Sequence, residues 1–180
     1  MQMALSMFAK IAVAVFLSLL AVAATSVPVA AKTPGEVEIG AVLREVEMTG
    51  LSGPSRKMSA FRGKPLIINI WASWCEPCRN EMASLDRLAR RYGGRQFNVI
   101  GISTDDYRDR ASAFLLRART SFGHYIDNDL ILENMLGADK IPLTLLVDAQ
   151  GRVQAKIYGA KEWDSAASKA LIAKTLGISL

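Results

Sequence analysis

Residues 65–78 read Pro-Leu-Ile-Ile-Asn-Ile-Trp-Ala-Ser-Trp-Cys-Glu-Pro-Cys, and they give the clearest structural signal in the chain. The first seven residues are apolar apart from Asn69, and a continuous apolar run of this length is typical of a strand buried on both faces. Apolar residues then recur at helical spacing over Glu76–Tyr92, and two glycines follow as a stop signal. A second apolar run occupies Phe97–Ile102. Strand, helix and strand within about forty residues predict a right-handed, parallel βαβ unit.

The two cysteines of the chain, Cys75 and Cys78, lie where the predicted strand meets the predicted helix. Unpaired N–H groups and the helix dipole favour a thiolate there, so Cys75 is expected to be the attacking nucleophile. Cys78 follows one helical turn later and is expected to be the resolving thiol. Pro77 fits the first helical turn, where a missing N–H costs nothing. Glu76 adds negative charge, which we expect to oppose thiolate formation and to favour a more reducing pair.

Other uses of the cysteine pair are less favoured. A zinc site normally needs four ligands, and His124 is the only histidine in the chain. A purely structural disulfide across three residues would constrain the unfolded chain very little. A dithiol that holds copper(I) stays open as a non-enzymatic alternative. We therefore expect no metal cofactor and a redox-active Cys75–Cys78 disulfide.

The rest of the sequence predicts further strands and helices, which extend the βαβ unit to a mixed sheet covered by helices. Leu143–Val147 and Val153–Tyr158 flank a four-residue turn and predict a hairpin. The other predicted elements are strands at Leu43–Leu51 and Arg56–Ser59, a helix at Tyr107–Arg119, an extended piece at 122–128, a helix at Leu130–Leu136, and a helix at Trp163–Leu176 with an alanine-rich apolar face that includes Trp163. This order predicts a three-layer α/β/α sandwich around a mixed central sheet.

The N-terminus predicts export. Lys10 precedes the apolar run Ile11–Ala24, and small residues end at Ala31, which is typical of a signal peptide over residues 1–31. A retained membrane anchor is the alternative, because no charge occurs between Lys10 and Lys32. Either segment would deliver the domain outside the cytoplasm, to the periplasm or the outer surface of the inner membrane. Residues 32–42 are expected to be a flexible linker before a domain over 43–180.

The composition of the chain limits the classes of partner that it is expected to bind. About half of the residues are apolar and 22% are charged, as in a folded globular protein. The net charge is +5, but the basic residues are scattered without interleaved aromatics, which argues against nucleic-acid binding. This balance suits contact with an anionic membrane surface or an acidic partner.

Several of these segments resemble one known family. Residues 71–78 resemble the active-site segment of the thioredoxin superfamily, and more narrowly its TlpA/ResA-like branch of exported thiol-disulfide oxidoreductases. Phe61–Pro65 resembles the segment that precedes the first buried strand in that branch, and Ile141–Asp148 resembles its proline-containing segment. Residues 105–137 stand in the place of its central insertion. The resemblance implies a thioredoxin-like sandwich with an N-terminal β extension.

The resemblance also implies site residues. Pro142 corresponds to a cis-proline opposite the nucleophile, and Ile141 precedes it. Glu81 stands where ResA-like members have a buried glutamate that tunes the thiols, although a solvated helix glutamate is the alternative. Asn69 stands where many thioredoxins have a buried aspartate, so Glu81 is expected to handle protons instead.

Further residues are assigned around this site. Trp74, Glu76 and Pro77, together with Ile141, are expected to contact the substrate, and Trp74 to shield one side of the nucleophilic sulfur. Leu143 stands where the family usually has threonine, which predicts a more apolar partner groove. His124 is expected to be an ordinary loop residue.

The resemblance implies a reductase of protein disulfides. Its electrons would come from a membrane dithiol donor, because no Gly-rich dinucleotide motif follows any predicted strand. Apocytochrome c before haem attachment and copper-delivery proteins are the implied substrates. A disulfide oxidase or isomerase is the main alternative, and a thiol peroxidase is disfavoured because its Pro-x-x-x-Thr-x-x-Cys run is missing.

Overall fold

The computed structural model describes residues 34–180, so the predicted signal or anchor at 1–31 lies outside the described residues. Within the described part, seven strands form one mixed sheet in the order β2-β1-β5-β4-β3-β6-β7. Strand β3 (Leu66–Trp71) is central, parallel to β4 (Asn98–Ser103) and antiparallel to β6 (Leu143–Val147). All six residues of β3 are buried, which explains why its sequence is continuously apolar.

The outer strands complete the sheet on both sides. Strand β5 (Gly123–Ile126) pairs in parallel with β4, and β1 (Glu47–Gly50) pairs antiparallel with β5. The two-residue strand β2 (Arg56–Lys57) forms one edge, and β7 (Val153–Tyr158) forms the other as the second strand of the predicted hairpin.

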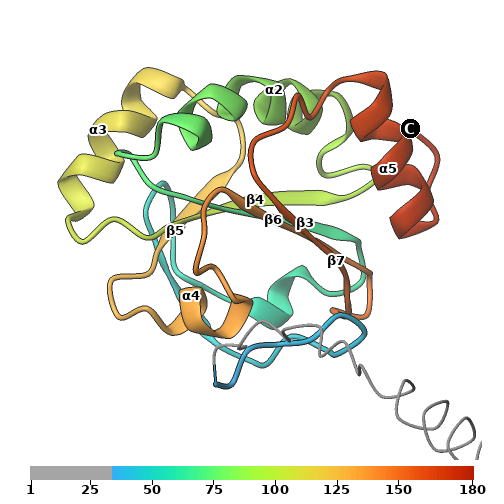
Figure 1. Ribbon diagram of the computed structural model, residues 1–180, viewed down its shortest axis with the longest axis horizontal. Coiled ribbons are helices and arrows are strands. Elements are labelled where there is room, and N and C mark those ends of the chain that lie inside the picture. The colour runs from blue at the N-terminus through green and yellow to red at the C-terminus, as the bar shows by residue number, and fades with distance from the viewer. Residues whose placement is uncertain (1–33) are drawn as a thin grey trace, which may run out of the picture. The chain divides into compact units, whose positions relative to one another are not determined.

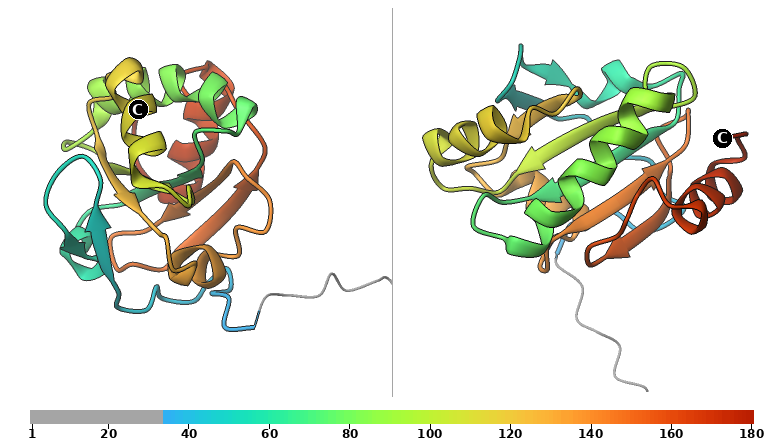
Figure 2. Two further views of the ribbon diagram at one scale, coloured as in Figure 1. Left: turned by 90° about the vertical axis from the view of Figure 1, so that its left-hand side faces the viewer. Right: turned by 90° about the horizontal axis from the view of Figure 1, so that it is seen from above.

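Helices cover both faces of the sheet. Helices α2 (Glu76–Tyr92), α3 (Arg108–Ala118) and α5 (Ala166–Leu176) lie on one face, while α4 (Ile131–Leu136) and the 3-10 helix η1 (Met58–Phe61) lie on the other (Figures 1 and 2). The chain is thus a three-layer α/β/α sandwich of the thioredoxin type, as predicted. None of the helices between residues 34 and 180 is both long and apolar enough to span a bilayer.

The predicted linker is wrong from Val37 onward. Val37 is buried, and its N–H donates a hydrogen bond to the carbonyl of Met135 at 2.8 Å. The N–H of Gly40 likewise donates to the carbonyl of Val153 at 2.7 Å. Residues 37–42 are therefore held against α4 and the start of β7, because their backbone donors find partners there.

The two N-terminal strands and the C-terminal helix differ most from the bounds predicted for them. The strand predicted from Leu43 begins only at β1, because the N–H of Leu43 bonds to the carbonyl of Gly151 instead. The strand predicted at Arg56–Ser59 turns into η1 after two residues. The C-terminal helix begins at Ala166 rather than Trp163, because Ser165 caps it by accepting a hydrogen bond from the N–H of Ser168.

The predicted apolar face of the C-terminal helix is also wrong. Ser168 and Ile172 are its buried residues, whereas Ala166, Ala167 and Ala170 are exposed. Trp163 is fully buried as expected, but it reaches the core from the loop before the helix. Ile172 and Trp163 share one apolar cluster, so the helix docks through its isoleucine rather than its alanines.

Candidate active site

The two cysteines lie at the point where β3 ends and α2 begins. They form a disulfide with Cα atoms 5.3 Å apart. Cys75 is the N-cap of α2, and its Sγ accepts a hydrogen bond from the N–H of Cys78 at 3.3 Å. Cys75 retains 5% of its accessible surface, whereas Cys78 is fully buried. A partner sulfur can therefore approach Cys75 more readily than Cys78.

Asp105 fixes the loop that leads into Cys75. This buried aspartate follows β4, whose carboxyl end lies beside that of β3. Its carboxylate accepts hydrogen bonds from the N–H of Ser73 at 2.8 Å and from the Ser73 hydroxyl at 2.6 Å. The Ser103 hydroxyl donates a third bond at 2.8 Å. Sequence reasoning missed Asp105, although a polar Ser-Thr-Asp run after a buried strand was the available signal.

The proline segment lies against the disulfide. The Ile141–Pro142 peptide bond is cis, as the resemblance implies. Ile141 is partly buried against the same apolar cluster that contains Cys75 and Cys78. The structure therefore brings residues 141–142 and the disulfide together, although 63 or more positions separate them in sequence.

The expectation about Leu143 is wrong. Leu143 is fully buried in the core cluster on the α4 side of the sheet, so it adds no apolar surface to a partner groove. The reason is the alternation of side chains along β6, which points Leu143 away from α2 and turns its neighbour Thr144 toward Asn69 of β3.

Glu81 is buried, so its alternative as a solvated helix residue is excluded. One carboxylate oxygen, Oε1, accepts a hydrogen bond from the side-chain amide of Asn69 at 2.7 Å. The other, Oε2, accepts from the indole N–H of Trp163 at 2.9 Å and from the backbone N–H of Lys161 at 3.0 Å. Asn69 also donates to the hydroxyl of Thr144 at 3.0 Å.

Burial raises the pKa of Glu81, although the three donors stabilise its charged form and oppose the rise. The group is thus able to hold a proton at a higher pH than an exposed glutamate. It lies one helical turn beyond Cys78 on α2.

His124 is not a loop residue, contrary to expectation. It lies in β5, is buried, and stacks against Phe122 and edge-on against Trp71. Its Nε2 is 2.8 Å from the hydroxyl of Thr120. Gly101 on β4 makes room for it, since a Cβ at that position would come within 2.2 Å of the imidazole Nδ1. Burial lowers the pKa of His124 to about 3, only slightly offset by the charge of Asp86.

Of the four residues assigned to substrate contact, three are exposed and Ile141 is half-buried. The side of the molecule around Cys75 exposes Glu76 and Pro77, and Trp74 retains 63% of its accessible surface. Between residues 34 and 180 no cluster of three or more His, Cys, Asp or Glu residues is arranged to hold a metal ion.

Comparison with known proteins agrees with this geometry. The sequence model of the AhpC/TSA family matches residues 39–166, most of the described domain. This chain belongs to the AhpC/TSA family. Its relatives include the thiol-disulfide oxidoreductase ResA of Geobacillus thermodenitrificans, 26% identical over 123 residues that cover 68% of this chain and 71% of ResA.

Two further comparisons point the same way. The thiol:disulfide interchange protein DsbE of Vibrio cholerae is 30% identical over 126 residues, which cover 68% of this chain and 66% of that protein. A solved structure from Chlorobium tepidum, assigned as a DsbE protein, superimposes with a TM-score of 0.72 at 24% identity, covering 79% of this chain and all of that one. The bonded pair and these relatives together show that the chain is a redox enzyme, a thiol-disulfide oxidoreductase.

Proposed function

We propose that this protein is an exported reductase of protein disulfides, in which Cys75 attacks and Cys78 resolves. The observation that carries the proposal is the difference in access between the two sulfurs at the start of α2. The backbone N–H of Cys78 points at the Cys75 sulfur and stabilises a thiolate there.

The reaction proceeds by two exchanges. In the reduced enzyme, the Cys75 thiolate attacks one sulfur of a substrate disulfide; the substrate S–S bond breaks, and the departing substrate sulfur takes up a proton. Cys78 then loses its proton and attacks the Cys75 sulfur of the mixed disulfide. The second substrate sulfur leaves as a thiol, two electrons have moved to the substrate, and the Cys75–Cys78 disulfide is restored.

Glu81 is proposed to handle the Cys78 proton. It is the buried titratable carboxyl on the same helix, and burial raises its pKa, so it keeps a proton to a higher pH than an exposed glutamate does. Asn69 takes the position at which an aspartate would serve, but an amide cannot accept the proton. Its role is to orient Glu81 through the 2.7 Å hydrogen bond.

Residues around the disulfide are proposed to bind the substrate chain. Trp74, Glu76 and Pro77 border Cys75 on its exposed side, and Ile141 together with the cis-linked Pro142 borders it from the β6 side. We propose that an extended substrate segment lies between these two borders.

The proposals on cellular location, electron donor and substrate rest on the similarity to these relatives. We propose a periplasmic location, with delivery by residues 1–31 as a cleaved signal or as an anchor in the inner membrane. Electrons would come from a membrane dithiol donor, with no cofactor besides the disulfide. Similarity to proteins named as thiol-disulfide oxidoreductase and thiol:disulfide interchange protein supports a disulfide as the substrate. We propose that this disulfide belongs to an apocytochrome c or to a copper-delivery protein, the substrates that the TlpA/ResA-like resemblance implies.

The reduction potential of the Cys75–Cys78 pair tests the direction of electron flow. Equilibration with glutathione and dithiothreitol buffers should give a value near or below about −250 mV, on the thioredoxin side of the scale. A value near −120 mV, roughly that of DsbA, would instead identify an oxidant and overturn the reductase proposal. Single-turnover reduction of an oxidised Cys-x-x-Cys-His peptide, compared with an oxidised copper-chaperone peptide, would then separate the two substrate classes.

A further inference from the structure

The α4–β6 connection, residues 137–142, brings Ile141 and Pro142 to the disulfide, yet few backbone hydrogen bonds hold it. Within the described part of the chain, the N–H groups of residues 139–141 donate to no other backbone group. At the β6 end, the carbonyl of Pro142 accepts a hydrogen bond from the N–H of Gly159 at 2.9 Å. Contacts at the other end, beside α4, therefore have to fix the path of the connection.

Gly137, the first residue of the connection, is enclosed from two sides. It is the C-cap of α4 with a φ of 75°, and its carbonyl accepts a hydrogen bond from the hydroxyl of Tyr158 at 2.9 Å. On the side where a Cβ would project, the carboxyl group of Glu36 fills the space, since a Cβ would come within 2.3 Å of its carboxyl carbon. Glycine is thus needed here both for the backbone conformation and for the close approach of Glu36.

Glu36 is itself fixed by a buried ion pair. Its carboxylate contacts the ammonium group of Lys156 on β7, and the two side chains retain only 16% and 8% of their accessible surface. Each of the other ion pairs among the described residues includes an arginine that is more than half exposed. Removing one partner of a buried pair leaves an uncompensated charge away from water, so Lys156 constrains the position of Glu36 strongly.

The edge strand β7 holds both contacts of Gly137. Lys156 and Tyr158 are two positions apart on β7, so both side chains face the α4 side of the sheet. Burial raises the pKa of Tyr158, and the charges of Glu36 and Asp139 raise it further, so the phenol keeps the proton that it donates to Gly137. One strand thus fixes Glu36 through charge and Gly137 through a hydrogen bond.

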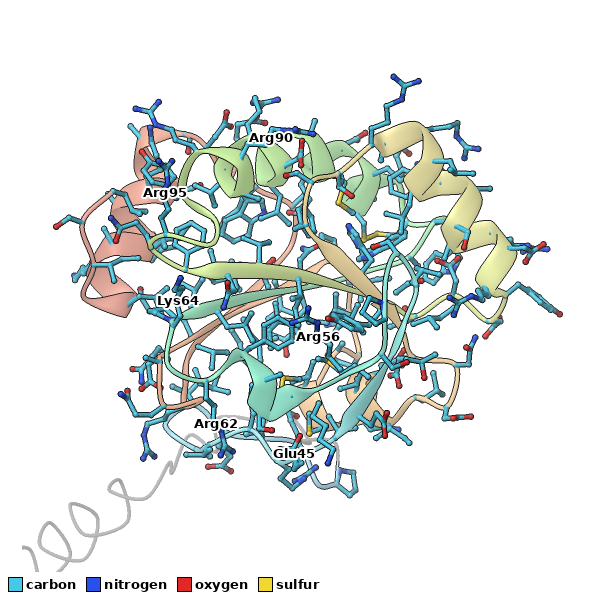
Figure 3. The ribbon with its side chains drawn as sticks, turned by 180° about the vertical axis from the view of Figure 1, so that it is seen from behind. Glu45, Arg56, Arg62, Lys64, Arg90 and Arg95 are labelled. Atoms are coloured by element: carbon cyan, nitrogen blue, oxygen red, sulfur yellow. A yellow bond between two sulfur atoms is a disulfide. The ribbon has the colours of Figure 1, made fainter. Side chains whose placement is uncertain are left out.

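The segment that carries Glu36 has further attachments of its own. The first described residues run below α4 in Figure 1, where the N–H of Val37 and the carbonyl of Gly40 both have hydrogen-bond partners. Further along, the Glu45 carboxylate accepts a hydrogen bond from a backbone N–H of η1 at 3.3 Å, and Figure 3 shows Glu45 near Arg62 at the same edge of the molecule. Removing the charge of Glu36 should therefore loosen the connection without detaching the segment.

We propose that Glu36 is a positioning residue: held by Lys156, it keeps the α4–β6 connection against β7 and so sets the path of the substrate-binding end of that connection beside the disulfide. The inference rests on the proposed contact of residues 141–142 with the substrate, and it holds for either direction of disulfide exchange. Glu36 contacts neither sulfur, so it acts on the binding of an extended chain and not on the chemistry of the thiols.

Exchange with two disulfides of different size tests the proposal. The reduced full chain is mixed with an oxidised Cys-x-x-Cys-His peptide, which can lie along residues 141–142, or with dithiodipyridine, a small disulfide that needs no such contact. Glu36→Gln keeps the shape of the side chain but removes its charge. It should raise the half-saturating peptide concentration about fivefold and leave the limiting rate within about twofold. The rate with dithiodipyridine and the reduction potential of the cysteine pair should stay at their wild-type values.

Matched variants separate the ion pair from a general loss of stability. Lys156→Met should also raise the half-saturating peptide concentration. The double variant should raise it by less than the product of the two single effects, because no unpaired buried charge remains. Glu162→Gln makes the same substitution in an exposed ion pair with Arg87 and should leave the peptide kinetics unchanged.

Two outcomes would overturn the proposal. If Glu36→Gln changes exchange with the peptide and with dithiodipyridine equally, the residue acts only through stability; if it changes neither, it has no positioning role. Ile141→Ala separates this failure from failure of the proposed function. When Ile141→Ala raises the half-saturating peptide concentration and Glu36→Gln does not, the substrate contact stands and the positioning role is wrong. When neither variant raises it, the proposed substrate contact is wrong as well.

Discussion

Replacing His124 should change how the stability of this protein depends on pH. The imidazole is buried between Trp71 and Phe122, and the charge of Asp86 offsets only part of the effect of this burial. Desolvation therefore lowers its pKa from 6.5 to about 3. In the unfolded chain the same group takes up a proton near pH 6.5. The stabilisation by neutral His124 is thus complete above pH 6.5 and is lost as the pH falls from 6.5 toward 3.

The magnitude follows from the two pKa values. One pKa unit corresponds to about 1.36 kcal/mol, so protonation of the unfolded chain alone lowers the free energy of unfolding by about 2 kcal/mol between pH 7.5 and pH 5. His124→Phe keeps a buried aromatic ring but cannot take up a proton. The variant should lose the bond to Thr120 and some stability at every pH, yet it should lack this pH-dependent part.

Urea titrations of the oxidised protein at pH 7.5 and pH 5 provide the measurement. Other groups contribute to both proteins, including Glu81, whose raised pKa acts in the opposite sense by lowering stability as the pH rises. The contributions of these other groups cancel when the free energy of unfolding lost between pH 7.5 and pH 5 is compared for the wild type and the variant. The difference between the two losses should be about 2 kcal/mol. Equal losses in the two proteins would refute the assignment of a buried neutral imidazole.

Three further substitutions probe the site. Glu81→Gln should move the pH profile of thiol alkylation in the reduced protein to lower pH, because a charge that opposes the thiolate is removed; an unmoved profile would count against a proton-handling role. Gly101→Ala should lower the free energy of unfolding by about 1–3 kcal/mol in urea titrations, because the new methyl would overlap the His124 ring, and an unchanged midpoint would show that the ring can shift. Asp105→Asn should destabilise the protein by about 1–2 kcal/mol and alter the rate of disulfide exchange, because one of the two oxygens that hold Ser73 is lost. An exchange rate equal to that of the wild type would mean that this anchor does not position the nucleophile.

The sequence correctly predicted the elements whose hydrophobic pattern fits only one kind of secondary structure. The run at β3 is apolar at nearly every position, so only a strand buried on both faces suits it, and the βαβ unit followed from it. Helix α2 was predicted with its observed bounds, since Cys75 and Pro77 mark its start and glycines its end. The predicted hairpin strands also match β6 and β7.

Where the sequence interpretation failed, the cause was contact between distant segments. Nothing near Val37 in sequence indicates that Met135 will accept its hydrogen bond. The alanines of α5 form an apolar stripe, yet the helix docks through Ile172, which packs into the same apolar cluster as Trp163. His124 was assigned to a loop because a single polar residue gives no sign of the space left by Gly101 on the neighbouring strand.

The sequence by itself determined the kind of chemistry, since a Cys-x-x-Cys pair between a buried strand and a helix places both sulfurs at a helix N-terminus. It could not determine the surroundings of that pair. Only the tertiary structure brought Asp105 to the active-site loop, residues 141–142 to the disulfide, and Trp163 to Glu81, because each contact depends on the order of strands in the sheet and not on the spacing along the chain.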